Sequence, residues 1–240
     1  KAVSPHEKKD LRDRSTVEAE RRLAANPEDG WAEALLGHVL HRQGKHAEAI
    51  EHLTKAEALL AKSNPPVSEP IVYQLRGDSH LILNKTAEAH ADLNRHIRLM
   101  EGAGKRPDAM AYSRRGLTRA SVGKLDEALL DFNMAVSLRQ DLPEIWNNRG
   151  FCRFKLGDFD GAIQDYKQGA LLCQERGLVY AVAGDSVNAF LLRIADVYLS
   201  AARAQLAAND TDAARASEAE ASKYRADAEL LVPKKTAGKE

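Results

Sequence analysis

Small, apolar and turn-forming residues recur in a fixed order through the middle of the chain. Four glycines are each followed seven residues later by a glycine or asparagine, twelve residues later by an alanine, and four residues after that by a large apolar residue. Because the spacing is constant within each set and varies between sets, it predicts repeated units joined by loops. The sets are Gly37, Gly44, Ala49 and Leu53; Gly77, Asn84, Ala89 and Leu93; Gly116, Gly123, Ala128 and Phe132; and Gly150, Gly157, Ala162 and Tyr166.

Each spacing has a physical reason in a pair of antiparallel helices. The second glycine or asparagine falls where a short turn needs a residue that tolerates positive φ. The first glycine and the alanine are small, so two helices can cross closely, and the large apolar residue lies on the same helical face as the alanine. The order therefore predicts a helical hairpin in each unit. Aromatic residues make up only 5% of the chain, which favours an all-α fold over a sheet.

The segments outside the four units also carry helical patterns. Thr16 to Ala25 reads as a helix, either a cap or the second half of a preceding repeat. After Cys173 the register fails, and an apolar stripe indicates a final helix pair, with Asp185 or Ser186 as the first N-cap and Thr211 as the second. The predicted divisions are 1–29 for the N-terminal helix; 30–63, 70–103, 109–142 and 143–176 for units one to four; 185–232 for a long degenerate pair or cap; and 233–240 for a disordered tail.

The pattern resembles the tetratricopeptide repeat (TPR), a 34-residue helical hairpin. The step from Gly116 to Gly150 is also 34 residues. The resemblance covers roughly residues 30–175 and implies a right-handed α-solenoid of antiparallel helix pairs, in which the first helices line a concave groove. It also implies a non-enzymatic scaffold that binds a peptide or helix of a protein partner in that groove. The matching positions are Trp146, Arg149, Gly150, Ala162 and Tyr166 in the best unit, and Tyr112, Arg115, Gly116, Ala128, Phe132 and Ala135 in the one before.

Three units depart from the family pattern by carrying an arginine where leucine is usual. Each of these units also has an aspartate fifteen residues after its first glycine, whereas the remaining unit has Leu36 and His52 at the two places. The arginine and the aspartate are thus either both present in a unit or both absent from it. This predicts structural ion pairs between helices, since partly buried charges need partners. Solvated surface charges are the alternative. The expected pairs are Arg76 with Asp92, Arg115 with Asp131, and Arg149 with Asp165.

The family's groove positions can be carried over onto this sequence. Large apolar residues flanked by amides and a few charges suit a peptide or helix that inserts side chains. The alternative is that several of them pack against neighbouring helices. Some members of the family bind a terminal carboxylate with a set of Lys, Asn and Arg residues from three successive repeats. This set is present neither in repeats one to three nor in repeats two to four, so an EEVD-like chaperone tail is not the expected ligand. The expected partner-binding residues are Trp31, Leu35, His38, Gln74, Leu75, Asp78, Leu81, Arg114, Leu117, Asn147, Asn148, Phe151 and Phe154.

Candidate chemistry is sparse. Cys152 and Cys173 fall on different helices, too far apart for a disulfide, and read as small packed thiols. Without a phosphate-binding loop, a dinucleotide fingerprint or a nucleophile elbow, the chain is not predicted to be an enzyme. Histidines crowd the first unit but lack an identifiable further ligand, so neither a metal nor a cofactor is expected. These histidines are His38, His41, His46 and His52.

The charge balance bears on the class of partner. Lys plus Arg and Asp plus Glu both total 35, which gives no overall attraction to nucleic acid or to an anionic membrane. No apolar run is long enough for direct membrane insertion. The leading partner is therefore a protein or peptide; a self-assembling, homo-oligomeric adaptor and, less favoured, single-stranded RNA binding are the alternatives. The compartment stays open: two unpaired cysteines favour a soluble cytoplasmic chain, and the missing initiator Met leaves a processed or exported form open.

Overall fold

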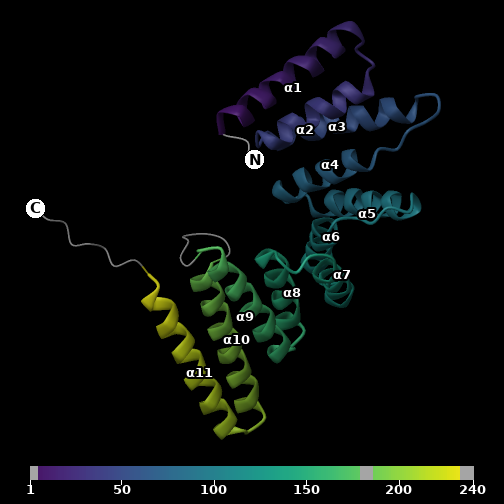
Figure 1. Cartoon of the computed structure of the whole chain (residues 1–240). Helices are drawn as coiled ribbons and strands as arrows, with labels where there is room; N and C mark the ends of the chain where they lie inside the picture. Colours follow the sequence, from purple (N-terminus) through teal and green to yellow (C-terminus); the bar gives the residue numbers. More distant parts are fainter. Residues whose placement is uncertain (1–4, 179–185, 233–240) are drawn as a thin grey trace, which may run out of the picture. The chain divides into compact units, whose positions relative to one another are not determined.

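Helices dominate the computed structural model, which describes residues 5–178 and 186–232 (Figure 1). These residues form eleven helices and no strand, so the predicted all-α fold is confirmed. The predicted tail, 233–240, and the candidate cap Asp185 lie outside the described residues. The helices are α1 (Pro5–Ala25), α2 (Gly30–Arg42), α3 (His46–Ala61), α4 (Pro70–Ile82), α5 (Thr86–Gly102), α6 (Ala109–Ser121), α7 (Leu125–Leu138), α8 (Pro143–Lys155), α9 (Phe159–Glu175), α10 (Val187–Ala207) and α11 (Thr211–Leu230).

The helices pack into two compact parts, with the boundary between Val122 and Gly123. Below, 'first unit' and 'second unit' denote these two parts, and 'repeat' or 'hairpin' denotes one pair of helices. In the first unit α2 pairs with α3 and α4 with α5, while α1 packs on α2, α3 on α4 and α5 on α6. In the second unit α8 pairs with α9 and α10 with α11, while α7 packs on α8 and α9 on α10. Within each unit the main contacts join helices that are neighbours in sequence, as in a stack of hairpins. The boundary falls inside the segment 109–142 that the sequence predicts as the third repeat.

Each unit has its own hydrophobic core. In the first unit Leu53 and Leu60 of α3 pack with Val72 of α4. In the second unit Tyr166 of α9 packs with Phe190 of α10, their ring centroids 6.2 Å apart. Burying a side chain of this size contributes about 1.5–3 kcal/mol relative to leaving it in water. The degenerate C-terminal pair therefore shares a core with the hairpin that precedes it.

The four turns that follow the first helices adopt the backbone conformation expected from the sequence. The φ angle is 79° at Gly44, 57° at Asn84, 80° at Gly123 and 82° at Gly157. Residues with a Cβ are disfavoured in this left-handed region, and asparagine is one of the few that enter it routinely. The prediction that these positions need glycine or asparagine is confirmed.

The glycines in the first helices lie where two helices leave no room for a side chain. A Cβ built on Gly37 would lie 2.7 Å from Cγ of Leu53, and a Cβ built on Gly150 would lie 2.8 Å from Cε1 of Tyr166. Both neighbours are the large apolar residues that end the repeated set. The predicted close approach at these glycines is therefore confirmed.

The C-terminal helix pair begins with polar caps. Ser186 Oγ accepts a hydrogen bond from the backbone N–H of Ala189 at 3.2 Å, and Asp210 Oδ1 accepts one from that of Ala213 at 3.1 Å. The prediction that Thr211 caps α11 is wrong, because Thr211 is already the first helical residue. Asp210 takes the capping place, where its negative charge also favours the positive end of the helix dipole.

Candidate functional site

Two of the expected ion pairs are present, and each joins the two helices of its own hairpin. Arg76 Nε and Nη2 donate to the two carboxylate oxygens of Asp92 at 2.9 and 2.7 Å, and Arg149 donates to Asp165 at the same two distances. The side chains of Asp92 and Asp165 are only 8% and 2% exposed. Both are bidentate, buried contacts between α4 and α5 and between α8 and α9, so the solvated alternative does not apply to them.

The third expected pair is divided between the two units. Arg115 lies on α6 of the first unit and Asp131 on α7 of the second. Asp131 is 3% exposed, and Arg115 Nη1 donates to Asn94 Oδ1 at 3.1 Å. The pairing of Arg115 with Asp131 stays a prediction.

The hairpin that lacks the arginine contains a different buried carboxylate. Glu33 of α2 is 1% exposed and contacts two basic side chains of α3, His52 at 2.6 Å and Lys55. Burial raises the pKa of Glu33, but the hydrogen bonds from His52 and Lys55 outweigh it and leave the pKa below its ordinary value. The acid lies on the first helix here and on the second helix in the α4–α5 and α8–α9 hairpins. The sequence gives no sign of this reversal.

The predicted groove residues of the first unit lie on α2, α4 and α6. Trp31 is 47% exposed at the start of α2. Gln74 Nε2 donates to Oδ2 of Asp108, the N-cap of α6, at 3.1 Å. These positions leave a mixed apolar and polar surface along the first helices. The half-buried members of this surface are Leu35, His38, Leu81 and Leu117.

Leu75 does not belong to this surface. It is 9% exposed and packs in the core with Leu53, Leu60 and Val72. This packing favours the alternative that Leu75 contacts a neighbouring helix, and its contact with a partner stays a prediction.

A buried ion pair joins α4 to α6. Arg114 Nη1 donates to Asp78 Oδ2 at 2.5 Å, and Asp78 is 7% exposed. Burial raises the pKa of Asp78 to about 6; Arg114 acts against this shift and the carboxylate of Asp108 adds to it. Asp78 Oδ1 is buried without a hydrogen-bond partner. The first unit therefore contains a carboxyl group that titrates well above its ordinary range.

The histidines of the first unit do not converge on one point. His41 Nδ1 lies 2.8 Å from Ser79 Oγ, and its ring meets His46 edge-on at 5.2 Å, whereas His52 contacts Glu33. Burial and neighbouring cations lower the pKa of His38 and of His41. Among the described residues there is no group of three or more His, Cys, Asp or Glu side chains that could hold a metal ion.

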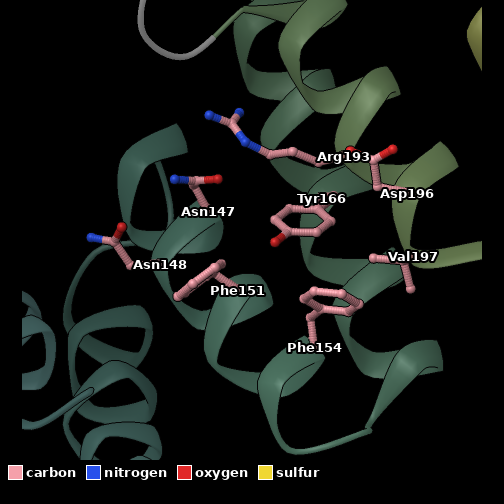
Figure 2. A pocket seen from close by; sticks show the side chains of 8 residues that line it. All are labelled: Asn147, Asn148, Phe151, Phe154, Tyr166, Arg193, Asp196 and Val197. Carbon is pink, nitrogen blue, oxygen red and sulfur yellow. The ribbon is translucent and has the colours of Figure 1, made fainter. Parts of the chain in front are cut away.

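The second unit contains a pocket of about 460 Å³ between α8, α9 and α10 (Figure 2). Phe151 is 46% exposed at its edge, whereas Tyr166 is 3% exposed and forms its inner wall. Four of the lining residues are predicted groove positions on α8. The lining is Asn147, Asn148, Phe151 and Phe154 of α8, Tyr166 of α9, and Arg193, Asp196 and Val197 of α10.

Two family models described as tetratricopeptide repeat match the chain, one at residues 143–175 and one at residues 34–59. The chain contains tetratricopeptide repeats. The first match spans α8 and α9, which contribute five of the eight residues that line the pocket. TPR repeats are in general protein–protein interaction modules, and the two matched segments support such a role for this chain.

Curated relatives share part of the TPR segment. RNA polymerase II-associated protein 3 of Mus musculus is 32% identical over 111 residues, which are 46% of this chain and 15% of the relative. The TPR repeat-containing thioredoxin TDX of Arabidopsis thaliana is 34% identical over 98 residues, which are 41% of this chain and 23% of the relative. The chain thus spans less than a quarter of the length of each.

A solved TPR structure has the same fold. YrrB, "a TPR protein with an unusual peptide-binding site", is similar with a TM-score of 0.61 and 15% identity, over 89% of this chain and 95% of that chain. At this identity the similarity concerns the fold, which is that of a TPR solenoid. None of the described helices is both long and apolar enough to cross a membrane.

The pocket of the last TPR hairpin combines aromatic faces with charged groups. Lys155 Nζ lies 5.3 Å from the ring centroid of Phe151 and 5.9 Å from that of Phe154. On α10, Asp196 pairs with Arg225 of α11 at 3.2 Å. Cations therefore lie against the aromatic edge of the pocket, while the one lining carboxylate already has a cationic partner.

Among the lining residues with a polar group, Tyr166 is the most enclosed. Burial raises its pKa to about 12, with Arg193 acting against the shift and the carboxylates of Asp165 and Asp196 adding to it. The hydroxyl is thus protonated at neutral pH and can donate a hydrogen bond. In Figure 2 it points from the ring toward the side of the pocket that holds Asn147 and Phe151.

Three of the eight residues that line this pocket lie on α10, beyond the residues that follow the TPR register. Arg193, Asp196 and Val197 share one face of α10 at spacings of three and four residues, a signal present in the sequence. What the sequence lacks is a sign of which helix this face meets, because the repeat spacing ends after Cys173. Tyr166 was assigned to packing alone, although it also forms a wall of the pocket.

Proposed function

We propose that the TPR repeats bind a peptide or helical segment of a partner protein, with the pocket between α8, α9 and α10 as the main contact. One observation carries this proposal: four residues that the repeat register assigns to the groove line a single pocket. A volume of about 460 Å³ lies within the range of protein ligand sites and accepts a large apolar side chain. These four residues are Asn147, Asn148, Phe151 and Phe154.

The exposed ring of Phe151 gives the pocket its affinity for an apolar anchor. Nearly half of this large side chain is in contact with water in the free chain. A partner side chain that covers it removes apolar surface from water at about 25 cal/mol per Å². The neighbouring amide of Asn147 supplies a donor and an acceptor that orient a peptide backbone.

The first unit supplies a second contact surface in this proposal. It consists of the exposed indole of Trp31 and the half-buried side chains already described on α2, α4 and α6. Gln74 and the Asp78–Arg114 pair provide its polar groups. Exposed aromatic residues beside amides and paired charges are typical of peptide-binding surfaces.

The proposed role does not include catalysis. Cys152, the cysteine nearest the pocket in sequence, donates its S–H to the carbonyl oxygen of Leu125 at 3.3 Å. Burial and the carboxylate of Asp126 raise its pKa to about 11, so the thiol is protonated at neutral pH. A protonated, buried thiol is a poor nucleophile.

The test starts from a random dodecapeptide library displayed on phage and selected on the intact chain. Enriched peptides are synthesised with a fluorescent label, and their affinity is measured by polarisation. Phe151→Ala should weaken binding more than tenfold, because truncating a central aromatic anchor typically costs about 2 kcal/mol or more. Circular dichroism checks that the helices are intact.

Leu171→Ala is the matched control, since Leu171 of α9 is 48% exposed and does not line the pocket. It should leave affinity unchanged. The opposite ranking, with Leu171→Ala abolishing binding and Phe151→Ala harmless, contradicts the proposal. Self-association is tested by light scattering at two protein concentrations. If no peptide binds and the measured molecular mass of the protein falls only in Phe151→Ala, this surface makes contacts between copies of the chain.

A further inference from the structure

The first helices of the first unit share an apolar residue in their first turn. Trp31 of α2, Ile71 of α4 and Met110 of α6 each lie six residues before the first glycine of their repeat. Trp31 and Ile71 are 47% and 42% exposed, and Met110 is half-buried. Because α4 packs on both α2 and α6, and stacked hairpins share one orientation, these side chains lie along one end of the surface. We call these three residues the N-terminal row.

The residue two positions before each member of the row is an acidic N-cap. Asp29 of α2 forms a bidentate pair with Arg22 of α1 at 2.9 and 3.0 Å. The other two N-caps, Glu69 of α4 and Asp108 of α6, form no ion pair among the described residues. Asp108 accepts hydrogen bonds only from uncharged groups, the amide of Gln74 and a backbone N–H. Two carboxylates beside the row are therefore not neutralised.

Cations in the adjoining loops do not bind these carboxylates. Lys62 is the C-cap of α3, and Lys105 and Arg106 lie in the loop before α6. All three are exposed, and none forms an ion pair within the described part of the chain. A cationic group of a ligand can therefore reach Glu69 and Asp108 without displacing a basic side chain.

The adjoining groove also contains more negative than positive charge. Asp78 is 7% exposed and is paired with Arg114, yet its Oδ1 is buried without a hydrogen-bond partner. Burial raises the pKa of Asp78 to about 6, Arg114 acts against this shift, and the carboxylate of Asp108 adds to it. One guanidinium group thus faces two carboxylates, so this part of the surface favours a cationic ligand over an anionic one.

The indole of Trp31 can itself attract a cation. Among the described residues no basic group lies over its ring, whereas Arg149 lies 4.9 Å from the ring centroid of Trp146 in the second unit. Exposed indole faces attract ammonium and guanidinium groups. The row therefore suits a segment that carries basic side chains next to apolar ones.

We propose that the first unit binds a basic, apolar segment of a partner protein. Apolar side chains of this segment cover the N-terminal row, and its Lys or Arg side chains contact Glu69, Asp108 and the indole of Trp31. This inference rests on the proposed function and adds the chemistry of the ligand at the second contact surface. Nucleic acids and anionic membranes are disfavoured, because the same carboxylates repel their phosphates.

The test is a selection from the same peptide library with a depletion step. Phage are first passed over the Trp31→Ala chain, which removes peptides that do not need the indole, and are then selected on the wild type. The recovered peptides should carry Lys or Arg within a few positions of a large apolar residue. Trp31→Ala should bind them more than tenfold more weakly. Ile71→Ala takes its place if Trp31→Ala is unfolded by circular dichroism.

Leu206→Ala is the matched control for the apolar contact. Leu206 of α10 is 47% exposed, the same fraction as Trp31, and lies in the second unit outside the pocket. This variant should bind the recovered peptides with wild-type affinity. A similar loss in Leu206→Ala and Trp31→Ala overturns the inference, because the effect would then not be specific to the row.

Glu69→Gln/Asp108→Asn tests the charges separately. Glu69 makes no capping hydrogen bond, and asparagine caps a helix as well as aspartate does, so the helices should stay intact. The double variant should bind the recovered peptides about threefold or more weakly, with a smaller dependence of affinity on salt. Asp212→Asn/Glu218→Gln makes the same change at exposed sites of α11 and should keep wild-type affinity. Equal affinity of the two double variants overturns the inference.

The remaining outcomes separate this inference from the proposed function. Phe151-dependent peptides without any Trp31-dependent ones, or Trp31-dependent peptides without a preference for Lys or Arg, overturn the inference and leave the proposed function standing. The absence of peptides that depend on either residue overturns both. A molecular mass that falls in Trp31→Ala by light scattering shows that a second copy of the chain covers the row. A fluorescein-labelled oligouridylate that binds only when Trp31 is present shows that the row serves nucleic acid. Either of these last two results also overturns the inference.

Discussion

Gly150 joins the packing of the second unit to its pocket. The glycine lies on α8 where this helix crosses α9, and its nearest neighbours across the crossing are the ring of Tyr166 and Cβ of Asp165. Tyr166 is also the inner wall of the pocket. A side chain at position 150 therefore acts on the ring that a ligand would touch.

Gly150→Ala should destabilise the second unit by about 1–3 kcal/mol, the usual range for overpacking a core. The added Cβ would meet Cε1 of Tyr166 at 2.8 Å, so the ring or the helix must move. The measurement is urea unfolding followed by circular dichroism. Gly102→Ala at the end of α5, where a Cβ meets nothing within 4 Å, should not lower stability. Equal unfolding midpoints for the two variants would mean that the crossing is looser than described.

Asp78 gives the first unit a dependence on pH. Burial raises the pKa of this carboxyl group to about 6, above the value of about 3.9 for an unfolded chain. The folded state then binds the proton more tightly than the unfolded state. The stabilisation linked to this proton is complete below about pH 4 and is lost as the pH rises through about 6.

Asp78→Asn removes this titration. The free energy of unfolding of the wild type minus that of the variant should fall between pH 4 and pH 6.5, by at most about 3 kcal/mol for a shift of this size. Urea titrations at several pH values measure it. Asp227→Asn, on the exposed side of α11, is the control and should keep the wild-type profile. A difference that rises with pH would contradict the assignment of the raised pKa to Asp78.

Pairs of helices in this fold are joined by buried charges as well as by apolar packing. Asp165 is 2% exposed and receives contacts from two guanidinium groups, those of Arg149 at 2.7 Å and Arg153 at 3.1 Å. In the first hairpin Glu33 meets His52 and Lys55 with the acid on the other helix. Both hairpins therefore contain a buried carboxylate that has basic partners on the other helix, and either helix can supply the acid.

Asp165→Asn should cost about 3 kcal/mol or more in the free energy of unfolding. The amide keeps the shape of the carboxylate but leaves two largely buried guanidinium groups without their counter-ion. Asp212→Asn is the control, because that carboxylate is 96% exposed and lies 3.9 Å from Arg215. Its unfolding midpoint should stay at the wild-type value. If the two variants unfold at the same urea concentration, the buried pair contributes little.

The helices and turns were largely predictable, and the small errors have physical causes. Gly44 and Asn84 mark turns by a backbone requirement that few residues meet, so their positions are readable from the sequence. The start of α11 was misplaced by one residue because Asp210 and Thr211 are adjacent and both cap well. Glu33 was missed because an isolated glutamate on a helix gives no sign of burial.

The site could be predicted only where the repeat register reaches. Asn147 and Phe151 followed from their places relative to Gly150, since the hairpin fixes which way each position faces. Leu75 lies in the core, whereas Leu35, at the same place relative to its glycine, is half-buried, so the register alone does not fix how exposed a position is. The wall that α10 contributes could not be placed in this way, because α10 lies beyond the repeat register and its position depends on packing between helices of different length.

The two walls of the pocket are under different constraints, and this bears on how its ligand could change in evolution. On α8, Gly150 and the buried pair of Arg149 with Asp165 leave few substitutions that keep the hairpin intact. On α10, Arg193 and Asp196 face the pocket, and the ion pair that Asp196 forms with Arg225 of α11 is largely exposed, so it contributes little to stability. Substitutions on α10 can therefore alter the charge and shape of the pocket at little cost to folding. Related chains could in this way acquire different partners while keeping the same repeat.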